Sequence, residues 1–212
     1  MRRRVARARW QDSAERVADQ PFVLMIAGPN GSGKTTLTNQ LRRAGIDFGH
    51  YINPDEIAVI LEGDYGERVR RAQAMADARR AACLLGRESF SFETVMSHPS
   101  KVDVLRDARG RGFRTLLYFI ATESPALNVA RVRQRVALGG HDVPEDRIRA
   151  RYARTLALLP DAIEAADDAV LFDNSYGRPT IRPFFRRRDG VVTLDPPTPN
   201  WAAAVLKSYA QP

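Results

Sequence analysis

The sequence predicts an α/β fold in which a parallel β-sheet is covered by helices on both faces. Short apolar runs alternate with segments of helical character along most of the 212 residues. One apolar run, 22–27, leads directly into Gly28-Pro29-Asn30-Gly31-Ser32-Gly33-Lys34-Thr35, which fits the pattern G-x-x-x-x-G-K-[ST] at every fixed position. Near the end of the chain, segments 180–188 and 191–194 are separated by Asp189-Gly190, a signature of a C-terminal β-hairpin.

The glycine-rich stretch 28–35 predicts a nucleoside triphosphate site. Its glycines let the backbone turn tightly and aim several N–H groups at one phosphate group. Lys34 supplies a mobile positive charge for the β- and γ-phosphates, and the Thr35 hydroxyl is placed to ligate Mg²⁺. The alternative is a glycine-rich turn with an accidental lysine. The apolar strand before the motif, and the helix from Lys34 to Arg43 stopped by Gly45 after it, favour a P-loop NTPase-type sheet that binds ATP and Mg²⁺.

The other elements are predicted from local patterns. The run 113–122 is the most strand-like, while Pro54 and Ser124-Pro125 suit helix starts. In chain order we expect a weak strand at 46–52, helices at 55–62 and 66–87, a strand at 90–95, a helix from Ser97 to Arg109, the strand at 113–122, helices at 124–138 and 144–159, a strand at 169–173, the hairpin, and a closing helix at 201–209.

The composition indicates one soluble domain over 21–212, preceded by a basic arm with a short helix over 1–20. Hydrophobic residues make up 44% of the chain, and no apolar run approaches the ~20 residues that span a bilayer. The single cysteine, Cys83, permits no disulfide within the chain, so we expect a cytoplasmic location. Despite a net charge of +8, we expect no nucleic-acid partner, because aromatic residues are not interleaved with the arginines.

Two carboxylates fall at predicted strand ends, where ligands bind in such sheets. Asp55 follows the second predicted strand and could take a proton from an attacking hydroxyl or bind Mg²⁺. A helix N-cap is an equally good role for Asp55. Glu93 lies inside an otherwise apolar strand, where burying a carboxylate is costly, so a functional role is favoured there.

The strand around Leu116 to Ile120 lacks the terminal acid that holds Mg²⁺ in an ordinary phosphate-loop ATPase, since it ends in Ala121-Thr122. This difference argues against a motor or transport ATPase and favours a small-molecule kinase.

The arginines around Gly139-Gly140 predict a helical lid that closes over phosphates. Their spacing places them in rows on two helices, Arg131 and Arg135 on the first and Arg147, Arg151 and Arg154 on the second. The alternative, that the arginines form a solvated charged face, applies to at least half of them. His98 and His141 are both near the predicted cleft, where loop hydrogen bonding is expected and a metal site is not.

Five motifs appear in an order that resembles the zeta toxin-like kinases. They are GPNGSGKTT (28–36), YINPDEIA (51–58), FSFETVMS (90–97), RVALGGHDVP (135–144) and LFDNS (171–175). The resemblance covers roughly residues 21–176. It implies a bacterial kinase that phosphorylates the 3′-hydroxyl of the sugar in UDP-N-acetylglucosamine and that a separate antitoxin protein neutralises.

The resemblance also implies roles for individual residues. Asp55 would be the catalytic base, Arg135 the first lid arginine, and Arg151 the second, because His141 stands near the place where the family has that arginine. The residues implied to bind ATP are Gly28, Asn30, Gly31, Ser32, Gly33, Lys34, Thr35, Thr36 and Asn174, with Thr35 also on the metal. Those implied to bind the acceptor are Asn53, Asp55, Ser91, Glu93, Thr94 and His98.

Three functional hypotheses result. The first is an ATP-dependent kinase acting on UDP-N-acetylglucosamine. The second keeps the kinase and changes the acceptor to another nucleotide sugar, a dinucleotide or an antibiotic; the short chain weakens the first hypothesis relative to this one. The third is a binding protein switched by its nucleotide state, which would need the phosphate loop and Mg²⁺ but no base at Asp55.

Overall fold

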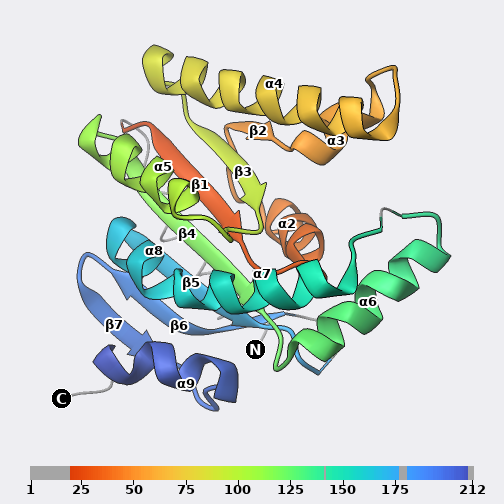
Figure 1. Ribbon diagram of the computed structural model, residues 1–212. Helices are drawn as coiled ribbons and strands as arrows, with labels where there is room; N and C mark the ends of the chain where they lie inside the picture. Colours follow the sequence, from red (N-terminus) through yellow and green to blue (C-terminus); the bar gives the residue numbers. More distant parts are fainter. Residues whose placement is uncertain (1–19, 141, 177–180, 210–212) are drawn as a thin grey trace.

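The computed structural model describes residues 20–140, 142–176 and 181–209. Most of the expected arm, and His141, therefore lie outside the described residues. Within them, one seven-stranded sheet has the order β2-β3-β1-β4-β5-β6-β7 (Figure 1). The parallel strands are β1 (Phe22–Ala27), β2 (His50–Ile52), β3 (Phe90–Thr94), β4 (Arg114–Ala121) and β5 (Asp168–Asp173). The predicted hairpin forms the antiparallel edge as β6 (Arg182–Arg188) and β7 (Val191–Leu194).

Helices cover both faces of this sheet, as the sequence predicts (Figure 1). Alternate residues of β1 separate into two cores: Val23 and Met25 face one side, and Leu24 and Ile26 face the other. The first core contains residues of α4 (Tyr65–Gly86), α5 (Pro99–Gly110), α8 (Leu159–Ala165) and α9 (Asn200–Leu206). The second core contains residues of α2 (Lys34–Arg43). All six residues of β1 are buried, which explains why this strand is apolar throughout.

Two helices extend from the end of β4 and return across the molecule, and they correspond to the predicted lid (Figure 1). α6 (Pro125–Ala137) and α7 (Glu145–Ala157) share a small apolar core of their own around Val132 and Ile148. The remaining elements are the short helix α3 (Pro54–Val59) and a 3₁₀ turn, η1 (Lys207–Tyr209). Within the described residues, no helix is long and apolar enough to cross a membrane.

Several predicted elements differ from the structure in extent; the helix expected at 55–62, for example, ends at Val59. The strand expected at 46–52 begins only at His50, because the Asp47 side chain accepts a hydrogen bond from the Gly49 N–H and Gly49 has a φ of 52°, which together make a turn. The helix expected at 144–159 ends at Ala157, and α8 begins at Leu159. Pro160 has no N–H to donate to the preceding turn, so the helical hydrogen bonding is interrupted there.

Candidate active site

The phosphate loop joins β1 to α2 with the geometry that its glycines require. Gly33 caps α2 with a φ of 101°, a left-handed conformation that strains other residues. A Cβ at this position would lie 2.4 Å from the Asn174 side-chain nitrogen. At Gly28, a Cβ would lie 2.1 Å from the Ile120 carbonyl oxygen. The loop is therefore packed against the ends of β4 and β5, and larger residues at these two positions would displace it.

Lys34 folds back over this loop. Its Nζ donates to the carbonyl oxygens of Gly28, at 2.9 Å, and Pro29, at 3.1 Å. Burial lowers the pKa of Lys34 to about 8, with Arg135 and Arg151 acting in the same direction. The carboxylates of Glu93 and Asp55 oppose this shift in the Lys34 pKa. These four predicted site residues, which come from four different elements, thus act electrostatically on one ammonium group.

Asp55 is exposed in the first turn of α3, and it is not the N-cap. The cap is Asn53, whose Oδ1 accepts a hydrogen bond from the Asp55 N–H at 3.0 Å. The helix-cap alternative for Asp55 is therefore wrong. Asn53 itself is buried, and its side chain fixes the direction in which α3 leaves β2. The Asp55 carboxylate therefore takes no part in capping α3.

Glu93 is the centre of a hydrogen-bond network between β2, β3 and α2. Its Oε1 accepts from the hydroxyls of Thr38 at 2.6 Å and Tyr51 at 2.9 Å, and its Oε2 accepts from Thr35 at 3.3 Å. The Tyr51 hydroxyl in turn accepts from the Asn53 side chain at 3.1 Å. Burial, and then the Glu93 carboxylate, raise the pKa of Tyr51. Glu93 is half-buried, and these three hydroxyl donors satisfy the hydrogen-bonding capacity of its carboxylate on the protein side.

Tyr51 and Thr38 were not among the sequence-predicted site residues. Tyr51 stands at the start of the motif YINPDEIA, and Thr38 lies one helical turn after Lys34 on α2. Their spacing from the known motifs could have suggested them. Their joint contact with Glu93 depends on the pairing of β2 with β3, which the sequence does not specify.

The two lid helices bring different arginines to different places. Arg151 on α7 lies 3.5 Å from the Asn30 side-chain oxygen and reaches the phosphate loop directly. Arg135, in the last turn of α6, is exposed and acts on the pKa of Lys34. Arg131 instead donates to the Asn174 backbone carbonyl at 2.8 Å, while the Asn174 side chain donates to the Ser32 carbonyl at 2.9 Å.

Arg131 thus secures the β5 loop against the phosphate loop. Outside the site, Arg149 and Arg133 pair with Glu145, and this bridge ties α6 to α7.

The remaining predicted residues are less directly placed. Thr94 holds the loop through its backbone, since its carbonyl accepts from the Gly28 N–H at 3.2 Å. Ser91 is fully buried. His98 is the N-cap of α5, and its Nδ1 accepts from the Ser100 N–H at 3.2 Å. Thr36 is exposed on α2. Their contacts with ligands stay predictions.

The donor set suits a magnesium ion that is held mainly by phosphates and water. Among the described residues, no group of three or more His, Cys, Asp or Glu side chains could hold a metal ion. The Thr35 hydroxyl and the Glu93 carboxylate are the hard oxygen donors next to the loop. Mg²⁺ needs few protein ligands when triphosphate oxygens are available, so these residues fit the ion.

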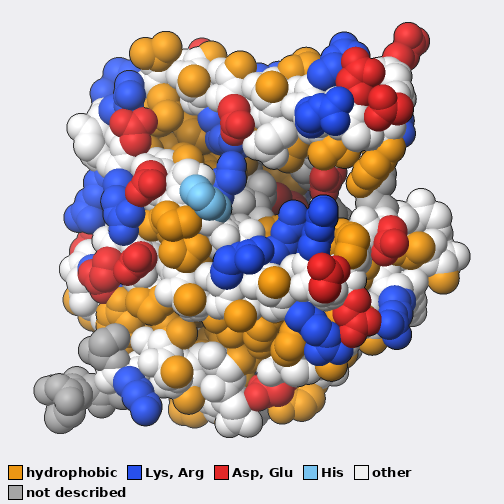
Figure 2. Space-filling view, in the orientation of Figure 1, with side chains coloured by type: hydrophobic (Ala, Val, Ile, Leu, Met, Phe, Trp, Pro, Cys, Tyr) orange, Lys and Arg blue, Asp and Glu red, His pale blue; other side chains and the backbone are white. Residues whose placement is uncertain are grey.

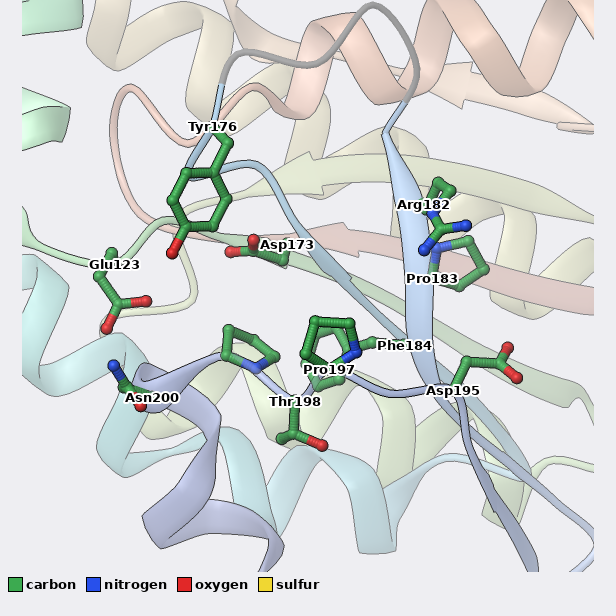
Figure 3. A pocket seen from close by; sticks show the side chains of 11 residues that line it. Glu123, Asp173, Tyr176, Arg182, Pro183, Phe184, Asp195, Pro197, Thr198 and Asn200 are labelled. Atoms are coloured by element: carbon green, nitrogen blue, oxygen red, sulfur yellow. The ribbon is translucent and has the colours of Figure 1, made fainter.

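The face that carries the site is hollowed between α4 and α7, and Lys and Arg side chains line the α7 side of the hollow (Figure 2). A separate pocket of about 160 Å³ lies at the end of β5 (Figure 3). Glu123, Asp173 and Tyr176 contribute to its wall. None of the described residues that line it belongs to the sequence-predicted site, so the pocket is not part of the candidate active site.

Sequence comparisons identify relatives of the chain. A family model described as zeta toxin matches residues 7–176. An uncharacterized protein of Haemophilus influenzae is 27% identical over 143 residues, which cover 63% of this chain and 94% of the relative.

Solved structures share the fold at low sequence identity. The AvrRxo1-ORF1:AvrRxo1-ORF2 complex with sulphate ions matches with a TM-score of 0.66 and 16% identity over 92% of this chain and 68% of that one. The same pair with ATP matches with a TM-score of 0.62 and 15% identity, over 90% of this chain and 66% of that one. A structure of the PezAT toxin–antitoxin system of Streptococcus pneumoniae matches with a TM-score of 0.57 and 17% identity, over 86% of this chain and 80% of that one.

These structures share the α/β fold of this chain, whose sheet ends in a C-terminal antiparallel hairpin. The family model covers the phosphate loop, both candidate carboxylates and the lid helices. On this basis, the chain belongs to the zeta toxin family.

Proposed function

We propose that the protein is a kinase that transfers the γ-phosphoryl group of ATP to a hydroxyl group of a small molecule. The single observation that carries this proposal is that a carboxylate and a lid arginine both reach the phosphate loop region: Glu93 accepts from Thr35 at 3.3 Å, and Arg151 lies 3.5 Å from the Asn30 side-chain oxygen. The charges of Asp55 and Arg135 act on Lys34 together with these two residues. A nucleotide switch requires the phosphate loop but has no use for an exposed carboxylate held beside it. A hydroxyl acceptor does require such a base.

The chemistry assigns a role to each group. The acceptor oxygen forms a bond to the γ-phosphorus while the bond from that phosphorus to the bridging oxygen of ADP breaks. Asp55 takes the proton that the hydroxyl loses, and Lys34 and the lid arginines balance the negative charge on the transferred group. Mg²⁺, when bound, neutralises charge on the β- and γ-phosphate oxygens.

The first acceptor to test is the 3′-hydroxyl of the amino sugar in UDP-N-acetylglucosamine. Family membership supports this choice, together with Glu93, which we expect to contact the sugar. The toxin–antitoxin system among the structural relatives supports a separate antitoxin as partner. Other nucleotide sugars, a dinucleotide or an antibiotic remain as acceptors for the same mechanism.

The decisive experiment incubates the full chain with labelled ATP, Mg²⁺ and a panel of these acceptors, and separates the products. A labelled nucleotide sugar that appears with wild type and not with Lys34→Ala supports the proposal. ATP binding without transfer to any acceptor in the panel would instead favour the nucleotide-switched binding protein.

A further inference from the structure

A buried cation lies on α4, outside the set of residues assigned above. Arg80 is only 6% exposed, and its guanidinium carbon lies 5.0 Å from the centre of the Phe92 ring on β3. Its one ion-pair partner among the described residues is Asp77, which precedes it by one turn and is more than half exposed. Taking a guanidinium out of water is costly, and an exposed carboxylate offsets only part of that cost.

A second cation, Lys101, stands beside it on α5. Its ammonium group has no hydrogen bond or ion pair with any residue that the structure describes, although the side chain is half-buried. Burial, and then the charge of Arg80, lower the pKa of Lys101.

The position of Lys101 in its helix is also adverse. It is the third residue of α5, where the helix dipole disfavours a positive charge, and the first turn of α5 contains no acidic residue. Two neighbouring cations that share one exposed carboxylate, one of them in the first turn of a helix, are an arrangement that a bound anion would stabilise.

Both cations lie on helices that border the hollow of Figure 2, Arg80 on α4 and Lys101 in the first turn of α5. Phe92, under Arg80, directly precedes Glu93, and the chain leaves β3 through Val95 and Met96 toward α5. The Thr155 hydroxyl of α7 donates to the Val95 carbonyl at 2.8 Å, so α7 crosses the end of β3. α4 and α7 therefore lie on opposite sides of the hollow in Figure 2, and the start of α5 closes one end of it (Figure 1).

We propose that Arg80 and Lys101 form a subsite for a phosphate or diphosphate group on the acceptor. A planar guanidinium and a mobile ammonium together match the geometry and charge of a dianionic phosphate, with Asp77 orienting Arg80 from the solvent side. The N–H groups of Ser100 and Lys101 are already bonded to His98, so the subsite acts through its side chains. This inference rests on the proposed function for the identity of the acceptor, but not for the binding of the anion.

The test measures binding without catalysis. The ATP site of the full chain is first saturated with a non-hydrolysable ATP analogue and Mg²⁺, and UDP, inorganic pyrophosphate and uncharged N-acetylglucosamine are then titrated by calorimetry. Lys101→Gln should bind UDP and pyrophosphate about tenfold more weakly, or worse, because one charge-assisted hydrogen bond is lost. Affinity for the ATP analogue and the uncharged sugar should not change.

The matched control is Lys207→Gln, which removes the same charge from an exposed lysine in η1. Arg80→Met keeps an unbranched side chain over Phe92 and should weaken the binding of UDP and pyrophosphate. If Arg80→Met fails to fold, Lys101→Gln alone decides the question. The subsite is overturned if wild type binds neither anion, or if Lys101→Gln binds both as wild type does. These binding measurements do not require phosphoryl transfer. Failure of the kinase proposal can therefore be distinguished from failure of the anion subsite.

Discussion

The phosphate loop and the acceptor side of the cleft are built in different ways. The loop is contiguous in sequence, and its shape is set by glycine backbone conformations and by carbonyl contacts to Lys34. The acceptor side combines the side chains of β2, β3, α2 and α3 around Glu93 and Asp55. The conformation of the loop depends mainly on its own sequence. The contacts among side chains on the acceptor side depend on which strands pair in the sheet. Variants on the two sides should therefore fail differently.

The largest effect is expected at Lys34. Lys34→Ala should abolish phosphoryl transfer and weaken ATP binding, because the ammonium stabilises charge on the β- and γ-phosphates in both the ground and transition states. A labelled-phosphate assay and an ATP titration measure the two losses separately. Wild-type turnover in this variant would refute the assignment of the phosphate loop.

The next effect is expected at the lid. Arg135→Ala should lower turnover by on the order of 10³-fold, the lower range for arginines that stabilise phosphoryl transfer. Arg43→Ala, which removes an exposed arginine in the last turn of α2, is the control. Arg151→Ala should also slow transfer, while Arg131→Ala should act mainly on stability through the Asn174 contact. Normal turnover in Arg135→Ala and Arg151→Ala would make the arginine rows a surface feature.

The acceptor side is tested most directly by Asp55→Asn. This change removes the proton acceptor and leaves the Asn53 cap in place, so transfer should fall about 10²-fold or more, with ATP·Mg²⁺ affinity within a few-fold of wild type and unfolding temperature unchanged. Any toxicity of the expressed protein should be relieved as well. Glu56→Gln alters the neighbouring exposed acid and serves as the control. Equal activity in the two variants would exclude Asp55 as the base.

The loop side has a pH signature of its own, in the affinity for ATP. The pKa of Lys34 is lowered to about 8 by burial, and a bound phosphate anion favours its charged form. ATP affinity should therefore be full below pH 8 and fall above it by at most about tenfold per pH unit. Calorimetry across this range should detect proton uptake on binding. Lys34→Arg stays protonated at these pH values, and the same slope in that variant would assign the titration to another group.

The smallest effect is expected from Tyr51→Phe. The loss of this hydroxyl leaves Glu93 held by Thr38 and Thr35, so turnover should fall several-fold and ATP affinity should not change. Tyr209→Phe removes a hydroxyl bonded to Glu164 far from the site and controls for stability. A drop in ATP affinity that matches the drop in turnover would show that the network supports the phosphate loop and not the acceptor side.

Most of the architecture could be predicted from local sequence. The six-residue apolar run of β1, the glycine pattern before Lys34 and the Asp189-Gly190 turn each specify a local conformation by steric or hydrophobic constraints that act within a few residues. The extents that were predicted wrongly involve interactions of the same short range. The Asp47–Gly49 turn and Pro160 interrupt these elements, although the apolar pattern that led to the prediction continues past them.

The assembly of the site was decided by tertiary structure. Several contacts of the site join segments up to 55 residues apart. Tyr51 and Thr38 both donate to Glu93, and Arg131 donates to Asn174. Asn53, next to Tyr51, caps α3. The residue type and its position in a motif indicate which chemistry a side chain can perform. Which partner it has is decided by the sheet order, because β2 and β3 must be adjacent before their side chains can share one carboxylate.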